Sequence, residues 1–180
     1  VLFNYNGTAD EDVSADMYFR WDDTNLYIGM VSADDHLAGH DDAWAGDGIQ
    51  IRVSAGAAMG AFVDTYVTLE ADGASFDGGS TGDASSFGLV AADGKINVMI
   101  AVPFEALGVE AAYDTILSFN MLRITGNETH PYAGWLAWGP FYGIGDKNNP
   151  GVTDANLLIL MNEVPEVEEP VGPVLPEGSI

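Results

Sequence analysis

Cysteine is absent from this sequence of 180 residues, which excludes disulfides, thiol catalysis and cysteine-ligated zinc sites. Basic residues are nearly as scarce: 5 Lys and Arg stand against 28 Asp and Glu, and the formal net charge is −23. Nucleic acids and anionic membranes are bound through cationic side chains, so neither is predicted as a partner. Long apolar runs are also missing, because no stretch approaches the roughly 18 residues that a membrane-spanning helix needs.

The acidic excess has three explanations, and composition does not choose between them. Acidic side chains keep a protein soluble, Asp-rich loops bind Ca²⁺, and a saline habitat favours acidic surfaces. Hydrophobic residues make up 47% of the chain, which is enough to fill the core of one domain. We therefore expect one folded domain over residues 1–162, followed by a Pro, Glu and Val-rich linker or C-terminal tail over residues 163–180.

Short stretches typical of β-strands recur along the chain, and in several of them, such as residues 15–21, 49–53 and 61–69, apolar and polar residues alternate as they do in half-buried strands. These stretches are residues 15–21, 26–32, 49–53, 61–69, 87–91, 95–102, 116–125, 135–138 and 156–161. Residues 71–86 are rich in Gly, Ser and Asp and predict a long loop, and Pro103 and Gly108 bracket one helical turn. The predicted fold class is all-β: an antiparallel two-sheet β-sandwich of jelly-roll or immunoglobulin-like type, with about eight to ten strands and almost no helix.

Residues 43–54 combine a tryptophan, a Gly-Asp-Gly turn and an alternating strand. Trp44 precedes the turn, so we expect its indole at a loop edge, and Gln50 and Arg52 occupy the polar side of the strand that follows. An aromatic platform beside hydrogen-bonding side chains suits a sugar ring, which has an apolar face and a polar rim. The alternative is that Trp44 closes one end of the sandwich core.

Four motifs follow one another along the chain. They are F-R-W-D-D-T-N-L-Y-I-G-M-V-S-A-D-D at residues 19–35, W-A-G-D-G-I-Q-I at 44–51, I-N-V-M-I-A-V-P-F-E-A-L-G at 96–108 with L-S-F-N at 117–120, and W-G-P at 138–140 before Asn156. Together these motifs resemble the family 9 carbohydrate-binding modules and the wider group of DOMON-like sandwiches. The resemblance spans residues 15–161 and implies the same sandwich fold.

Modules of that family are similar in being non-catalytic and attached to secreted plant-cell-wall hydrolases. They grip terminal sugars between two tryptophans, and a structural calcium ion is common. The resemblance places Trp44 on the first clamp position and Gln50 on an acidic residue that hydrogen-bonds sugar hydroxyls, which an amide can also do. No tryptophan stands in residues 143–153, where the second clamp residue would lie, so we assign that place to Phe141 or Tyr142.

Two sets of site residues follow from these patterns. The predicted carbohydrate-binding residues are Trp44, Gln50, Arg52, Asn120, Phe141 and Tyr142. Carboxylates and carbonyls in the loop of residues 34–42 suit a hard cation, and the predicted Ca²⁺ ligands are Asp34, Asp35, Asp41 and Asp42. His36 and His40 would share a face only on a helix, which Gly39 disfavours, so no transition-metal site is predicted.

Catalysis has no comparable signal. Residues 78–82 match G-x-S-x-G by letters, but we expect neither the strand before them nor the helix after them that a nucleophile elbow requires. No Asp or Glu stands in a distinctive apolar setting that would raise its pKa for glycoside hydrolysis. We therefore predict that the protein is not an enzyme.

These patterns predict a non-catalytic carbohydrate-binding module of an extracellular bacterial multidomain protein, stabilised by calcium and secreted or held at the cell surface. The predicted partner is a plant cell-wall polysaccharide or oligosaccharide whose ring stacks on Trp44. The alternative is a structural or assembly domain of a cell-surface protein that has the same fold and binds no sugar.

Overall fold

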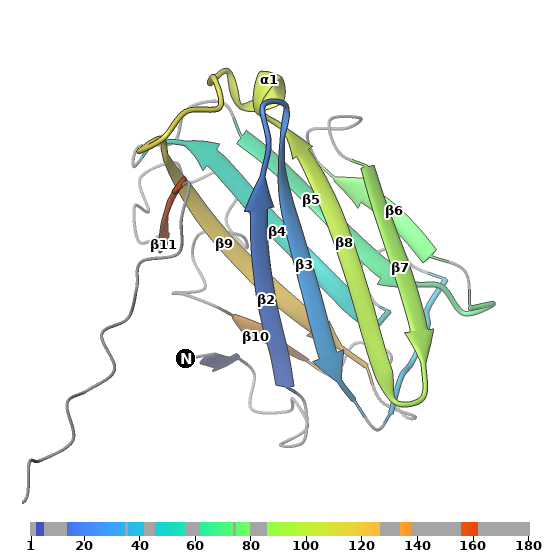
Figure 1. Ribbon diagram of the computed structural model, residues 1–180. Helices are drawn as coiled ribbons and strands as arrows, with labels where there is room; N and C mark the ends of the chain where they lie inside the picture. The colour runs from blue at the N-terminus through green and yellow to red at the C-terminus, as the bar shows by residue number, and fades with distance from the viewer. Residues whose placement is uncertain are drawn as a thin grey trace, which may run out of the picture.

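A computed structural model describes residues 3–5, 14–34, 36–41, 46–56, 62–73, 75–79, 86–126, 134–137 and 156–161. These residues contain eleven strands and one helical turn (Figure 1). The strands are β1 (Phe3–Tyr5), β2 (Ser14–Trp21), β3 (Asn25–Ala33), β4 (Gly48–Ala55), β5 (Phe62–Leu69), β6 (Ser75–Gly79), β7 (Ser86–Ala92), β8 (Lys95–Pro103), β9 (Ile116–Thr125), β10 (Gly134–Ala137) and β11 (Asn156–Ile159), and the helical turn is α1 (Phe104–Leu107). In this part of the chain, no helix has the length and apolar character to cross a membrane.

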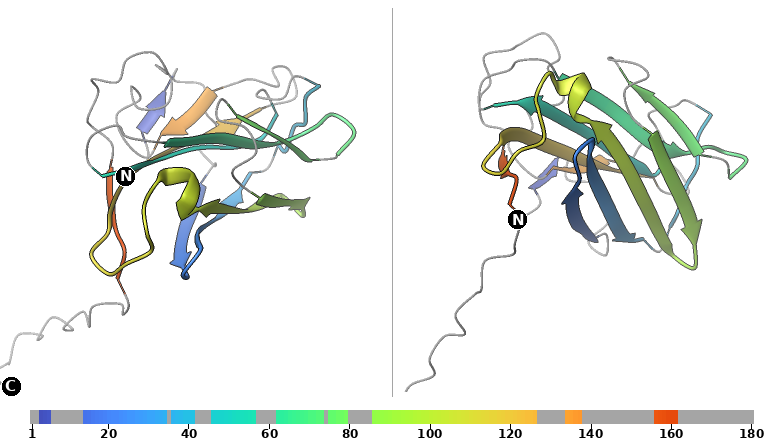
Figure 2. Two further views of the ribbon diagram at one scale, coloured as in Figure 1. Left: turned by 90° about the horizontal axis from the view of Figure 1, so that it is seen from above. Right: turned by 45° about the horizontal axis from the view of Figure 1, so that its top comes forward.

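The strands form two sheets that lie against each other as layers (Figure 2). The larger sheet has seven strands, six of them in the order β1-β10-β9-β4-β5-β6. The seventh, β11, pairs with residues 116–119 of β9 on the same edge that β10 uses at residues 122–125. The smaller sheet has four strands in the order β2-β3-β8-β7. All pairs between the described strands are antiparallel, which confirms the predicted β-sandwich.

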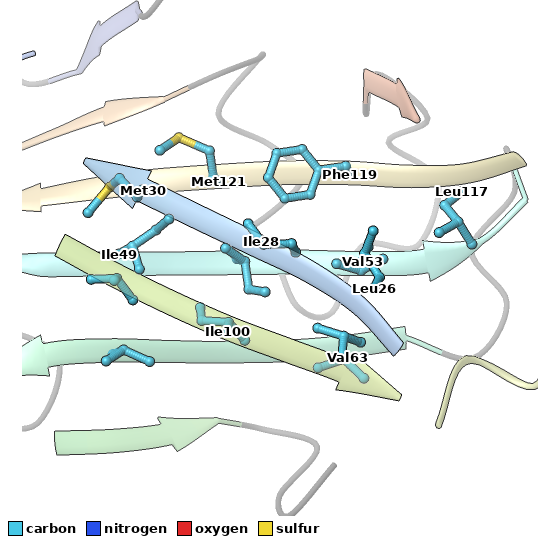
Figure 3. Packing of buried hydrophobic residues seen from close by; sticks show 14 of the residues in the cluster. Leu26, Ile28, Met30, Ile49, Val53, Val63, Ile100, Leu117, Phe119 and Met121 are labelled. Atoms are coloured by element: carbon cyan, nitrogen blue, oxygen red, sulfur yellow. The ribbon is translucent and has the colours of Figure 1, made fainter. Parts of the chain in front are cut away.

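Alternation along the strands decides which side chains fill the space between the sheets. On β3, for example, Leu26, Ile28 and Met30 are each only 1% exposed, while the residues between them are less buried. Both sheets contribute to one core, which includes Leu26, Ile28, Met30, Ile49, Ile51, Val53, Val63, Ile100, Leu117, Phe119 and Met121 (Figure 3). Full burial of one such side chain stabilises the fold by about 1.5–3 kcal/mol, so a one-residue slip of any central strand is strongly disfavoured.

The turn between β2 and β3 shows why the first motif has its particular residues. Oδ1 of Asp22 accepts hydrogen bonds of 2.8 Å from the backbone N–H groups of Thr24 and Asn25, and Oδ2 accepts one of 2.8 Å from the hydroxyl of Tyr27. These bonds hold the pKa of Asp22 well below its usual range, and the largest part of this lowering comes from the N–H of Thr24. The Asp, Thr, Asn and Tyr of the motif therefore build the hairpin turn itself.

Two local predictions had different outcomes. Residues 75–79, which we predicted as part of a loop, form the edge strand β6. That prediction was wrong because β6 is held by backbone pairing with residues 65–69 of β5, and such pairing does not require alternating apolar residues. The first two glycines of the G-x-S-x-G match lie in this strand. The helical turn is confirmed as α1, which ends at Gly108 with a left-handed φ of 65°. The predicted tail, residues 163–180, lies outside the described residues.

Candidate functional site

The outer face of the seven-stranded sheet carries polar side chains at its centre. On β4, Gln50 and Arg52 alternate with the core residues Ile49 and Ile51, so they point away from the core. The strand register places Arg52 directly opposite Asn120 of β9. Three of the predicted carbohydrate-binding residues therefore lie together on one face of the sandwich.

Asp64 of β5 joins this polar row and lies directly opposite Arg52. Asp64 is 0% exposed, and its Oδ1 accepts a hydrogen bond of 2.8 Å from Nε2 of Gln50. Because a carboxylate only accepts, this bond fixes the amide of Gln50 with its nitrogen toward Asp64. Within the described residues, no donor to the amide oxygen of Gln50 is seen. Asp64 was not predicted as a site residue. The sequence signal that could have identified it is that Asp64 is the one charged residue of β5.

Arg52 and Asn120 are themselves buried, at 6% and 2% exposure. The guanidinium carbon of Arg52 lies 4.2 Å from the ring centroid of Phe62, a cation–π contact, and Oδ1 of Asn120 accepts a hydrogen bond of 2.8 Å from the backbone N–H of the next residue. Gln50 and its cross-strand neighbour Tyr66 are only half-buried. A ligand on this face would therefore meet Gln50 and Tyr66, while Arg52 and Asn120 support the sheet around them.

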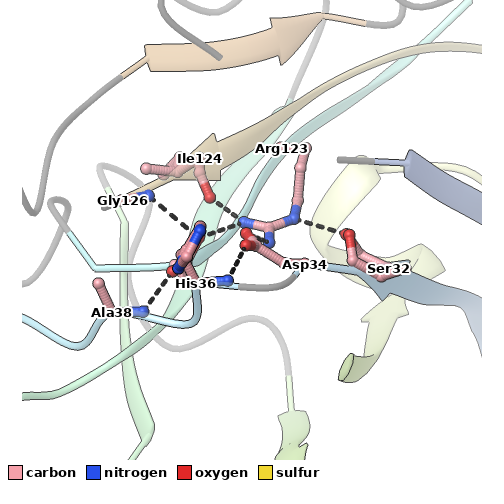
Figure 4. Close-up of polar contacts among 9 residues, drawn as sticks. Ser32, Asp34, His36, Ala38, Arg123, Ile124 and Gly126 are labelled. Atoms are coloured by element: carbon pink, nitrogen blue, oxygen red, sulfur yellow. Dashed lines mark hydrogen bonds and ion pairs between the residues drawn. The ribbon is translucent and has the colours of Figure 1, made fainter. Parts of the chain in front are cut away.

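A buried arginine ties together both ends of the loop that joins β3 to β4 (Figure 4). Arg123 of β9 is 0% exposed. Its Nη2 lies 2.8 Å from Oδ2 of Asp34, and its Nη1 lies 2.8 Å from Oδ1 of Asp47. Its Nε donates a hydrogen bond of 2.8 Å to the hydroxyl of Ser32, and Nη1 also donates to the carbonyl of Ile124. All the nitrogens of this guanidinium are thus engaged inside the sandwich.

The two carboxylates of this cluster accept further hydrogen bonds from the backbone. Oδ1 of Asp34 accepts one of 2.8 Å from the N–H of His36. Oδ2 of Asp47 accepts one of 2.6 Å from the N–H of Ala38, and its Oδ1 accepts one of 3.1 Å from the N–H of Gly126. Burial raises the pKa of Asp47 to about 6, and the guanidinium opposes that rise. The expectation that no Asp or Glu has a setting that raises its pKa was therefore wrong for Asp47, because its burial depends on distant parts of the chain. The cluster therefore links the loop backbone to a buried charge network.

Backbone hydrogen bonds fix the loop on both sides of residues 42–45. The N–H of Asp47 donates to the carbonyl of Ala38 at 2.8 Å, and the N–H of Leu69 donates to the carbonyl of Asp47 at 2.8 Å. The N–H of His40 donates to the carbonyl of Leu69 at 3.1 Å. The described parts of the loop are therefore tied to each other and to the end of β5.

Comparison with known proteins identifies this architecture. No family model and no curated protein matches the sequence. The fold is similar to that of a family 9 carbohydrate-binding module (CBM9) from Caldicellulosiruptor kristjanssonii in complex with glucose, with a TM-score of 0.66 and 13% identity over 90% of this chain and 84% of that one. A CBM9 from the same organism in complex with cellotriose gives a TM-score of 0.67 and 15% identity over 92% of this chain and 84% of that one. The fold is CBM9-like.

The CBM9-like fold confirms what the four motifs predicted about architecture, and the predicted site residues stand as follows. Those outside the described residues are Trp44, Phe141, Tyr142, Asp35 and Asp42. Asp34 does not fit a Ca²⁺ site, because both of its carboxylate oxygens accept from N–H donors and one of these donors is the cation Arg123. Asp41 is exposed, and the described part of the chain gathers no three His, Cys, Asp or Glu side chains that could hold a metal ion. Calcium binding stays a prediction for Asp35, Asp41 and Asp42.

Arg123 is the residue of this CBM9-like fold that local sequence patterns missed. It occupies an inward position two residues after Met121 and four after Phe119, where alternation predicts an apolar side chain. A charged residue at such a position was the available signal. Its partners could not be inferred from that signal, because Asp47 and Asp34 lie 76 and 89 positions away in the sequence.

Proposed function

We propose that this protein is a non-catalytic carbohydrate-binding module. The observation that carries the proposal is the hydrogen bond between Gln50 and Asp64, which orients a half-buried amide on the outer face of the seven-stranded sheet. A sugar site needs such oriented polar groups beside an aromatic platform. Trp44 lies in the loop that leads directly into the strand of Gln50, so one segment of chain supplies both kinds of group.

In this proposal the sugar contacts Trp44, Gln50 and an aromatic residue after β10, while the buried Arg52 and Asn120 support the sheet. A sugar ring stacks on Trp44, with Phe141 or Tyr142 as the second platform, and the amide oxygen of Gln50 accepts a hydrogen bond from a hydroxyl. The two similar structures are complexes with glucose and with cellotriose, which supports a glucan of the plant cell wall as the ligand class. We place the module in a secreted or cell-surface multidomain bacterial protein.

The buried carboxylates support binding over hydrolysis. Asp34 and Asp47 share the guanidinium of Arg123, and Asp64 accepts a hydrogen bond from Gln50. A glycosidase instead presents two carboxyl groups to the bond that it breaks, one of them able to give up a proton. Carboxylates at 2% exposure or less that are held by N–H donors suit a positioning role.

Gln50→Ala is expected to weaken the binding of cellotriose by about tenfold, because a hydrogen bond to the sugar is lost and Asp64 loses one of its donors. A glycan array identifies the preferred sugar, and isothermal titration calorimetry measures the affinity. Asn97→Ala is the matched control, since it removes an exposed amide from the outer face of the other sheet. Equal affinities for wild type and Gln50→Ala would contradict the role of Gln50.

Calcium binding by Asp35, Asp41 and Asp42 is a separate part of the proposal. A bound ion stabilises the folded state, so we expect EDTA to lower the melting midpoint by about 3 °C, which corresponds to about 1 kcal/mol in a chain of this size. Asp41→Asn should abolish this response, and Asp93→Asn, at an exposed Asp in the turn before β8, should retain it. An unchanged melting midpoint of the wild-type protein with EDTA would contradict calcium binding.

A structural or assembly domain is the second candidate, and the burial of the polar row favours it. Arg52, Asp64 and Asn120 are at most 6% exposed, as expected of polar groups that hold a sheet face together without a ligand. A folded wild-type protein that retains no glycan on an array of plant and bacterial polysaccharides would favour this candidate over sugar binding.

A further inference from the structure

The cluster around Arg123 lies at the base of the loop of residues 34–47. Asp34 is the first residue after β3, and Asp47 is the last residue before β4. The guanidinium bridges them with two N–O distances of 2.8 Å, and all three side chains are at most 2% exposed. Ion pairs shielded from water are screened much less by salt than surface pairs. The loop is therefore closed at its base by a contact that salt screens only weakly.

The planar shape of the guanidinium sets the spacing of the two loop ends. Nη1 and Nη2 each bind a different carboxylate, while Nε donates to the hydroxyl of Ser32. A lysine ammonium is a compact point charge and cannot hold three acceptors in one plane at fixed angles. The geometry at the base of the loop thus depends on the forked, planar shape of the guanidinium as well as on its charge.

The two carboxylates also accept hydrogen bonds from the backbone in and around the loop. Asp34 accepts from the N–H of His36, and Asp47 accepts from the N–H groups of Ala38 and Gly126. The first two of these donors lie within the loop, and the third follows β9. A loop that is already ordered loses less conformational entropy when a ligand binds, so such ordering strengthens binding.

We propose that Arg123 is a positioning residue for carbohydrate binding. It fixes the described parts of the loop, residues 34, 36–41, 46 and 47, from which Trp44 reaches the sugar, and it does so from inside the sandwich without touching the sugar. This inference rests on the proposed function, because that loop carries Trp44. It adds that affinity depends on a buried residue of β9, separately from the stability that the same residue gives the fold.

Arg123→Lys tests the proposal, because it keeps the charge and removes the fork. We expect cellotriose to bind at least about tenfold more weakly by calorimetry. Hydrogen exchange at the amides of Ala38 and Gly126 should also be at least about tenfold faster, while circular dichroism still shows the folded sandwich. Ile100→Val is the matched control: it removes a methyl group from a fully buried core residue of the other sheet, so it lowers stability without touching the loop. That control should leave cellotriose affinity and these two amides unchanged.

The outcomes separate this proposal from the proposed function. Wild-type affinity in Arg123→Lys, or an equal loss in Ile100→Val, overturns it. Should Arg123→Lys not fold, Ser32→Ala replaces it, since it removes the acceptor of Nε and keeps the two carboxylate partners of Arg123; a loss of about threefold is expected, and unchanged affinity overturns the proposal. A wild-type protein that binds neither glucose nor cellotriose overturns the proposed function and the binding role together, and amide exchange then decides separately whether Arg123 orders the loop.

Discussion

Arg123→Met is expected to destabilise the folded protein by about 3–5 kcal/mol, the range for a buried ion pair that loses one partner. The substitution leaves the carboxylates of Asp34 and Asp47 inside the sandwich, at 2% and 0% exposure, without the cation that they share. Urea denaturation followed by circular dichroism measures the loss. Arg20→Met, the same substitution at an exposed position of β2, should change the free energy of unfolding by less than about 0.5 kcal/mol.

The loss of unfolding free energy in Arg123→Met should also depend on pH. Burial already raises the pKa of Asp47 from 3.8 to about 6, and removal of the guanidinium raises it further. A carboxyl group whose pKa is raised in the folded state favours folding at low pH, and that contribution is lost as the pH rises through the folded-state pKa. The loss should therefore be larger at pH 7 than at pH 4. Additional Asp34→Asn and Asp47→Asn substitutions, which remove the stranded charges, should recover part of it, and a loss below about 1 kcal/mol at pH 7 would contradict this account.

Gly46→Ala is expected to destabilise the protein by about 2–3 kcal/mol, because the loop backbone passes too close to β5 for a methyl group. A Cβ at this position would lie 1.9 Å from the carbonyl oxygen of Leu69 and 3.1 Å from the backbone nitrogen of His40. Both neighbours are backbone atoms joined by their own hydrogen bond, so neither can move aside cheaply. Thermal and urea denaturation measure the effect.

Gly88→Ala is the matched control for Gly46→Ala. Gly88 lies on β7 at an exposed position, and a Cβ there would meet no atom within 4 Å. Alanine restricts the unfolded chain more than glycine does, so this substitution should be neutral or should stabilise by up to about 1 kcal/mol. If Gly46→Ala lowered the free energy of unfolding no more than Gly88→Ala does, the close approach at Gly46 would be contradicted.

Much of this fold could be predicted from the sequence, because it depends on local alternation. β3 shows the principle: its apolar residues recur at every second position, and they are the ones buried in the core. The turn chemistry of Asp22 is local as well, since its partners lie within five residues. β6 could not be predicted in this way, because it is an edge strand whose only identified requirement is backbone pairing with β5.

The site could be predicted only in part. Gln50 and Arg52 share a strand, so alternation alone puts them on one face. Their proximity to Asn120 and Asp64 depends on the registers of β4 with β9 and β5, which no local pattern contains. The Arg123 cluster is harder to predict, because it joins β9 to both ends of a loop that is distant in the sequence. It also places a charged residue where alternation predicts an apolar one.

An NMR titration of the ¹⁵N-labelled wild-type protein with cellotriose tests the central claim most directly. We expect the amide shifts of residues 36–50 and of Tyr66 to change, and we expect these changes to disappear in Trp44→Ala. The outer face of the four-stranded sheet, where Tyr18 and Met99 are 58% and 55% exposed, should show none. No change at millimolar cellotriose, or changes centred on Tyr18 and Met99, would contradict sugar binding at the loop of residues 34–47 and the face of Gln50.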